Sequence, residues 1–132
     1  MALNPPLTKL PAQLQAIDVM RDAAVIPVIV LTDVAYAVPL ARALVAGGIR
    51  MLEVTLRTPQ ALECIERIAK EVPEAVAGAG TVRSARDAQA AAKAGARFAV
   101  SPGFTNAVGA ACRDVGLPLL PGVATGDRKS VV

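Results

Sequence analysis

Charged and polar side chains alternate along one otherwise apolar segment, residues 51–57, which reads MLEVTLR. In a strand, Glu53, Thr55 and Arg57 would point to the same face, because every second side chain does. Two charges on the face of a buried strand are costly unless they are paired or used. One interpretation is an internal Glu53–Arg57 ion pair that only stabilises the interior. We favour the other, a catalytic or binding site, where such groups cluster.

Further polar residues follow the other apolar segments. Thr81 comes directly after Gly78-Ala79-Gly80, and the next two segments end in Ser101-Pro102-Gly103 and Pro121-Gly122. Pro-Gly pairs are also ordinary turn signals, and Thr81 could cap a helix, although Ser84 is better placed for that role. In parallel α/β folds, ligands bind beyond the carboxyl ends of the strands. The shared location of these residues therefore predicts a site at that edge.

The elements that must position these residues recur every 20 to 25 residues. Short apolar runs predict five strands, at residues 25–31, 51–56, 75–82, 97–103 and 117–124. Helical periodicity predicts a short first helix at 12–21 and further helices at 35–45, 59–71, 85–94 and 106–115. Glycines that follow these helices, at 47–48, 95 and 116, are expected to form left-handed caps. Thr58 is expected to cap the helix that begins at Pro59.

Strands joined in succession by helices must be parallel, with right-handed crossovers, so the fold class is α/β. Composition and period leave two architectures open, a doubly wound open sheet and a (β/α)8 barrel. The segment at 78–80 does not complete a dinucleotide fingerprint, because position 83 is Arg, and no GK[ST] phosphate loop is present. A nucleotide-dependent oxidoreductase therefore lacks its sequence signature.

Composition restricts the function further. The 132 residues are 54% hydrophobic and 2% aromatic, which suits one domain of Ala-rich helices against Val- and Ile-rich strands. A net charge of +3, with few aromatics, gives little support for nucleic-acid binding. We see no signal peptide and no apolar run of about 18 residues, so we expect no membrane association. Cys64 and Cys112 are then expected to be reduced thiols in a cytoplasmic protein. Without histidine or CxxC, no metal site is expected.

Several blocks together make the sequence recognisable: ALVAGGIRMLEVTLRTPQAL, IAKEVPEAVAGAGTV, GARFAVSPGFT and LPLLPGVAT. They closely resemble the class I 2-keto-3-deoxy-6-phosphogluconate (KDPG) and 4-hydroxy-2-oxoglutarate aldolases, over residues 25–125. The resemblance implies a (β/α)8 (TIM) barrel without a cofactor, a homotrimer when full-length, and cleavage of a phosphorylated keto-deoxy sugar acid to pyruvate and glyceraldehyde 3-phosphate. The 2-keto-3-deoxy-6-phosphogalactonate aldolases are close relatives, and the sequence leaves the substrate's stereochemistry open.

The resemblance also implies residue roles. In this family a lysine forms a Schiff base with pyruvate, and a glutamate that matches Glu53 carries protons. Arg57 and Thr81 match the residues that hold the carboxylate and ketone region of pyruvate, and Pro102 matches a residue that lines the site. The chemistry agrees, since a guanidinium binds a carboxylate through two hydrogen bonds and enamine chemistry needs a nearby proton carrier.

The Schiff-base lysine of the family lies at the end of the sixth strand, whereas the pattern here contains five. Lys9, Lys70, Lys93 and Lys129 are all expected to be solvated surface charges. The family's phosphate-binding loops belong to strands seven and eight. We therefore expect residues 1–125 to form the N-terminal part of one barrel, inactive alone and prone to aggregate through its open edges. The alternative is a non-catalytic half-barrel that binds a keto acid or assembles with a partner chain.

Residues 126–132, GDRKSVV, depart from the family pattern. One back-translation of DRKSVV is GATCGGAAGAGCGTCGTG, which matches a widely used sequencing adapter that continues with a stop codon. We therefore expect this tail to be adapter read-through; the alternative is a native C-terminus. Long-read resequencing distinguishes the two.

Overall fold

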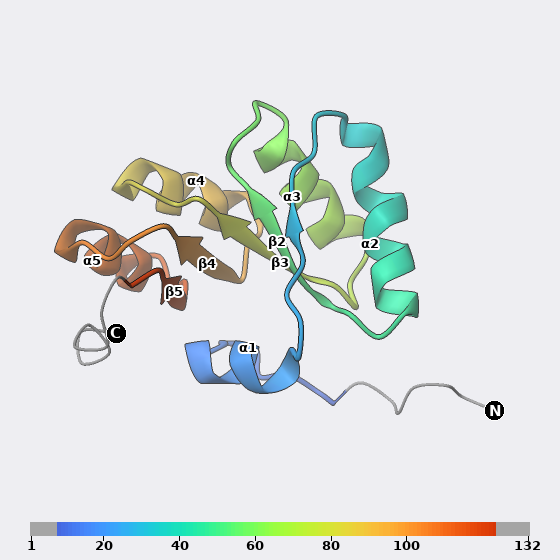
Figure 1. The fold of residues 1–132 in the computed structure, drawn as a ribbon, viewed down its shortest axis with the longest axis horizontal. Coiled ribbons are helices and arrows are strands. Elements are labelled where there is room, and N and C mark those ends of the chain that lie inside the picture. Colours follow the sequence, from blue (N-terminus) through green and yellow to red (C-terminus); the bar gives the residue numbers. More distant parts are fainter. Residues whose placement is uncertain (1–7, 124–132) are drawn as a thin grey trace.

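The structure is a computed structural model that describes residues 8–123, and one parallel sheet organises it (Figure 1). The strands are β1 (Val28–Ile29), β2 (Met51–Thr55), β3 (Val76–Gly80), β4 (Phe98–Ser101) and β5 (Leu119–Pro121). The helices are α1 (Ala16–Asp22), the 3-10 helix η1 (Val34–Tyr36), α2 (Ala37–Ala46), α3 (Ala61–Glu71), α4 (Ala85–Ala94) and α5 (Asn106–Asp114). The predicted α/β class and the five parallel strands are confirmed.

Strand order decides between the two architectures that the sequence left open. The order is β1-β2-β3-β4-β5, with every neighbouring pair parallel, and α2 to α5 follow one another along the same face (Figure 1). A doubly wound sheet reverses its strand order to place helices on both faces, whereas a (β/α)8 barrel adds each strand beside the last. The described residues therefore form a sector of a barrel wall, with helices outside.

The core has two parts, one on each face of the sheet. Between the sheet and the outer helices, alternate strand residues such as Leu52 and Val54 pack with Ile65 and Ile68 of α3. On the inner face, Met51, Val76 and Phe98 form a smaller cluster with residues of the N-terminal segment, Leu14 and Val19. Because both faces are covered here, all five residues of β2 are buried.

The N-terminal segment closes the inner face at the amino ends of the strands, where α1 lies (Figure 1). Arg50, directly before β2, makes an ion pair with Asp22 at the end of α1, with Nε 2.9 Å from Oδ2. Arg97, directly before β4, donates through Nη2 to the carbonyl of Pro11 at 2.8 Å. The Gly116 carbonyl, shortly before β5, accepts a hydrogen bond from Gln13 Nε2 at 2.8 Å. Groups that precede β2, β4 and β5 thus hold the N-terminal segment in place.

Several local predictions need correction. The first helix begins at Ala16 rather than at residue 12, and β1 is only two residues long. Thr58 does not cap a helix: α3 begins at Ala61, and Thr58 Oγ1 donates instead to the carbonyl of Leu31 at 2.6 Å. The reason is tertiary, because the loops after β1 and β2 lie side by side and offer that carbonyl.

Other local predictions are confirmed. Ser84 caps α4 by accepting from the Asp87 amide, and Gly95 follows this helix in the left-handed conformation. Gly48 and Gly116 also have positive φ after their helices. The helix α3 ends without such a glycine, at Val72.

The two cysteines lie on the inward faces of α3 and α5. Both thiols are free and buried, and burial raises the pKa of each. Over residues 8–123, no helix combines the length and the apolar character needed to cross a membrane.

Candidate active site

Glu53 is the central charged group on the inner face of the sheet. It lies in the middle of β2, between Leu52 and Val54, whose side chains face the outer helices. Only 9% of Glu53 is exposed. This burial raises the pKa of the carboxyl, and the positive charge of Arg57 lowers it to a smaller extent. A carboxyl held this way keeps its proton to a higher pH than an ordinary surface glutamate, which suits a group that carries protons.

The neighbouring strand β3 leaves room for this carboxyl. Its inner face carries Gly78 and Gly80, which have no side chains. A Cβ atom at Gly80 would lie 2.8 Å from Cγ and 2.9 Å from Cδ of Glu53, and one at Gly78 would overlap the ring of Phe98. The sequence showed two glycines here, but it did not show that each leaves room for a particular side chain.

Arg57 lies beside Glu53 but outside the strand, so the predicted strand alternation does not extend to it. The strand β2 ends at Thr55, and Arg57 follows in a turn with its side chain exposed. Within residues 8–123, the ion pairs do not include a Glu53–Arg57 pair. The purely structural interpretation of these two charges therefore fails for the described part of the chain. Arg57 remains available to an anionic ligand.

Thr81 follows β3 and has an unusual backbone. Its φ is +60°, the only positive φ of a non-glycine residue among the described residues. For a β-branched residue this left-handed conformation costs about 1–2 kcal/mol, and such strain concentrates at functional sites. The side chain of Thr81 is half-buried. No signal in the sequence indicated this strain.

Pro102 follows β4 on the same edge. It is exposed, and its carbonyl packs so closely against Gly122 that a Cβ atom there would lie 2.9 Å from the Pro102 carbonyl carbon. With Arg83 and Thr105, Pro102 also lines a cavity of about 190 Å³. Buried Ser101 donates to the carbonyl of Gly103 at 2.8 Å, which stabilises the turn rather than presenting a free hydroxyl.

Backbone hydrogen bonds align the ends of these strands. The Leu56 amide donates to the Gly80 carbonyl at 2.9 Å, and the Val82 amide donates to the Val100 carbonyl at 3.0 Å. The residues that follow β2, β3 and β4 are therefore held at one edge. Three of the predicted site residues, Arg57, Thr81 and Pro102, thus follow the carboxyl ends of consecutive strands, and the fourth, Glu53, lies within β2 on the inner face of the sheet.

Thr55 is a polar residue on the same face that belongs to the framework. It is fully buried, and its Oγ1 donates to the carbonyl of Ile29 at 3.3 Å. This bond ties β2 to the edge strand β1 and leaves the hydroxyl donor satisfied.

The lysines within residues 8–123 lie elsewhere, as predicted. Lys70 is on the outer side of α3, where it pairs with Glu66 at 2.6 Å, and Lys93 is exposed on α4. Lys9 is exposed in the N-terminal segment. Lys129 and the predicted tail lie outside the described residues.

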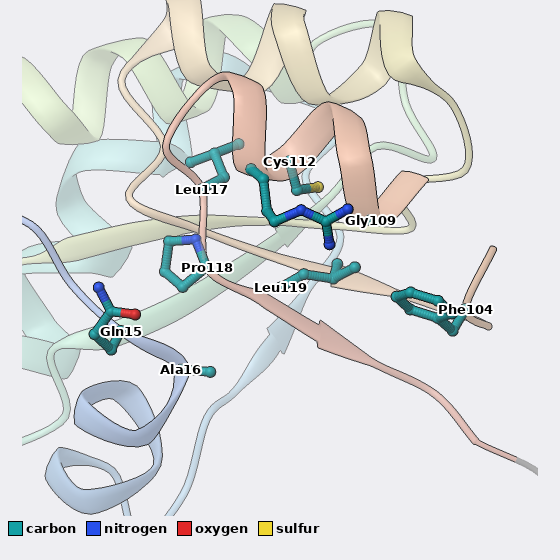
Figure 2. A pocket seen from close by; sticks show the side chains of 9 residues that line it. Gln15, Ala16, Phe104, Gly109, Cys112, Leu117, Pro118 and Leu119 are labelled. Atoms are coloured by element: carbon teal, nitrogen blue, oxygen red, sulfur yellow. The ribbon is translucent and has the colours of Figure 1, made fainter. Parts of the chain in front are cut away.

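A second cavity, of about 220 Å³, is shown in Figure 2, and it shares Phe104 with the cavity that Pro102 lines. It is bounded by α5, by Leu117, Pro118 and Leu119 on the way into β5, and by Gln15 and Ala16 of the N-terminal segment. Among the described residues that line it, Arg113 is the charged one. Because it holds none of the four predicted residues, its size alone does not make it the reaction site.

Comparison with known proteins gives a consistent result. Residues 16–129 match the family model described as "KDPG and KHG aldolase". The chain is 57% identical over 107 residues to the 2-dehydro-3-deoxy-phosphogluconate aldolase of Zymomonas mobilis, covering 81% of this chain and 51% of the relative. It is 52% identical over 108 residues to the enzyme of the same name from Pseudoalteromonas atlantica, covering 82% and 50%.

A solved structure agrees with these relatives. The KDPG aldolase of Legionella pneumophila, with pyruvate captured as a covalent carbinolamine intermediate, has a TM-score of 0.81 and 44% identity, covering 86% of this chain and 55% of that one. The chain thus spans about half the length of the curated relatives it matches.

Proposed function

Because the chain belongs to the KDPG and KHG aldolase family, we propose that it carries the pyruvate-binding and proton-transfer part of an aldolase. The reaction is cleavage of 2-keto-3-deoxy-6-phosphogluconate to pyruvate and glyceraldehyde 3-phosphate. The observation that carries this proposal is the buried Glu53 carboxyl on the inner face of β2, with Arg57 and Thr81 in the segments that follow β2 and β3.

The chemistry assigns a role to each of these groups. Arg57 binds the carboxylate of the keto acid, for which its planar guanidinium offers two parallel donors. Thr81, in the segment that follows the neighbouring strand β3, offers a hydroxyl to the carboxylate or the ketone oxygen. Glu53 accepts the proton of the C4 hydroxyl as the C3–C4 bond breaks, and it then returns that proton to C3 of the resulting enamine. Pro102 lines the wall of the site.

Breaking the C3–C4 bond to give the enamine requires a group that accepts the electron pair of that bond. By resemblance, the family uses the Schiff base of a lysine for this purpose. Amine attack on the C2 carbonyl, with loss of water, gives an iminium that accepts the electron pair of the breaking C–C bond. By resemblance, that lysine belongs to a sixth strand and the phosphate loops to strands seven and eight. Accordingly, we propose that the 132 residues bind pyruvate without forming the adduct. The resemblance also leads us to propose a homotrimer for the full-length enzyme, acting in the cytoplasm.

Pyruvate binding tests this function directly. Titration of the 15N-labelled chain with pyruvate should shift the amide signals around Arg57 and Thr81, and Arg57→Ala should weaken that binding about 10-fold or more. Arg67→Ala is the matched control, because Arg67 lies on α3 with half its side chain exposed, and its ion pair within residues 8–123 is with Glu63. Equal effects of the two substitutions would contradict the assignment.

Borohydride trapping tests the covalent step. With labelled pyruvate and borohydride, the 132-residue chain should remain unlabelled, whereas a full-length relative should retain the label. A labelled chain would show that one of its own lysines acts as the nucleophile.

A further inference from the structure

The inner faces of β2, β3 and β4 form one row at the level of Glu53. Glu53 pairs with Gly78 in register, and Gly78 pairs with Phe98. Two large side chains therefore approach β3 from opposite sides. Phe98 lies over Gly78, and the Glu53 carboxyl leans along the strand toward Gly80.

The two glycines differ in what a side chain would displace. At Gly78, a Cβ atom would meet the ring of Phe98, which is fully buried and has no space to move. At Gly80, it would meet the end of the Glu53 side chain, with Cγ at 2.8 Å and Cδ at 2.9 Å. The end of a glutamate side chain is flexible, and Glu53 as a whole is 9% exposed, so the carboxyl has a path toward the open edge of the site. Neither glycine has positive φ, so alanine fits the backbone at both.

We propose that Gly80 is a positioning residue for Glu53, because its lack of a side chain lets the carboxyl lie against the backbone of β3 within reach of substrate. A methyl group at this position would push the carboxyl outward without unfolding the sheet. The catalytic meaning of this placement rests on the proposed function. The placement itself is a property of the fold and can be tested separately.

The position of the carboxyl determines how it holds its proton. Burial is the larger influence on Glu53 and raises its pKa, while Arg57 opposes it. No other charged residue lies on the inner faces of β1, β3, β4 or β5 at this level. Moving the carboxyl toward water removes the larger influence and keeps the smaller one, so the pKa of Glu53 falls toward its ordinary value.

Carboxyl 13C NMR titration of the whole chain provides the test. The Glu53 signal should titrate at a lower pH in Gly80→Ala than in the unsubstituted chain. Gly103→Ala is the matched control, because a Cβ atom at Gly103 would have no neighbour within 4 Å, and the titration of Glu53 should not change. An unchanged Glu53 pKa in folded Gly80→Ala would overturn the proposal.

A thermodynamic cycle covers the case in which Gly80→Ala folds poorly. If the clash with Glu53 is the cause, adding Glu53→Ala should restore most of the lost stability, because the methyl group then has space. A loss of the same size in the Glu53→Ala background would show that Gly80 acts through the backbone alone, and it would overturn the proposal.

Pyruvate binding separates the two proposals. A chain that does not bind pyruvate, but whose Glu53 titration responds to Gly80→Ala, contradicts the proposed function and leaves the positioning role of Gly80 intact. If the chain binds pyruvate and the pKa of Glu53 is the same in Gly80→Ala, the proposed function stands and the positioning role of Gly80 is contradicted.

Discussion

Replacing Arg50 should destabilise the protein strongly, although Arg50 directly precedes β2 and so lies at the opposite end of the strands from the candidate site. Its guanidinium is only 8% exposed, and the Asp22 side chain is 11% exposed. The pair is bidentate, with Nε 2.9 Å from Oδ2 and Nη2 bonded to Oδ1, and this hydrogen bonding raises the pKa of Arg50. It joins the end of α1 to the start of β2 and so holds the N-terminal segment over the inner core.

The size of the effect follows from what remains after the change. Arg50→Met removes two charge-assisted hydrogen bonds and leaves the Asp22 carboxylate nearly buried without its partner. Breaking one side of a buried pair costs about 3–5 kcal/mol, and the partial exposure of Asp22 places this case near 3 kcal/mol. For a domain of this size, that loss lowers Tm by roughly 10–15 °C. Adding Asp22→Ala should recover most of it, because the unpaired charge is then gone.

Urea unfolding followed by circular dichroism measures these differences at pH 7. Lys70→Met is the matched control: its ion pair with Glu66 is exposed, at 71% and 50%, so its loss should leave the urea midpoint almost unchanged. An Arg50→Met penalty no larger than that of Lys70→Met would refute the reasoning.

Three further predictions concern the site and the inner face. Thr81→Gly should stabilise the chain by about 1 kcal/mol in urea unfolding, because glycine adopts a positive φ without strain. The same substitution should weaken pyruvate binding, because the hydroxyl is lost. Thr81→Ala keeps the backbone strain and should not stabilise the chain. Because burial raises the folded-state pKa of Glu53, the folded chain holds this proton more tightly than the unfolded chain, and stability should fall as pH rises above 4.5. Glu53→Gln should lose that part of the pH dependence, and an identical profile would contradict the burial of the carboxyl. Val28 lies on the edge strand β1 and Val30 directly follows it, and their side chains are 60% and 52% exposed. These apolar side chains should promote self-association of the chain. The double substitution Val28→Thr with Val30→Thr should reduce that association, measured by sedimentation velocity.

Much of the fold was predictable from local patterns. Apolar runs of strand length, alternating with helical periodicity, located five strands and the helices between them, because side-chain periodicity depends only on the backbone conformation of each segment. Ser84 and Gly95 marked the ends of α4 for the same local reason. Glu53 stood out because a charge in a buried strand is costly wherever it occurs.

Long-range contacts decided the rest. The choice between an open sheet and a barrel wall depended on which strands pair. Thr58 does not cap α3 as expected, because its hydroxyl donates to a carbonyl of the loop after β1. The sequence identified Arg57 as a charged residue near the site. Because β2 ends at Thr55, Arg57 lies in an exposed turn rather than on the strand, which the sequence did not indicate.

The sequence by itself therefore determined the elements and the chemical groups of the candidate site. The tertiary structure determined how those groups are held: the Glu53 carboxyl against Gly80, the strained backbone of Thr81 and the Arg50–Asp22 pair beneath them. The physical reason is that side-chain space, backbone strain and ion pairing depend on residues distant in the chain, whose approach no local pattern encodes.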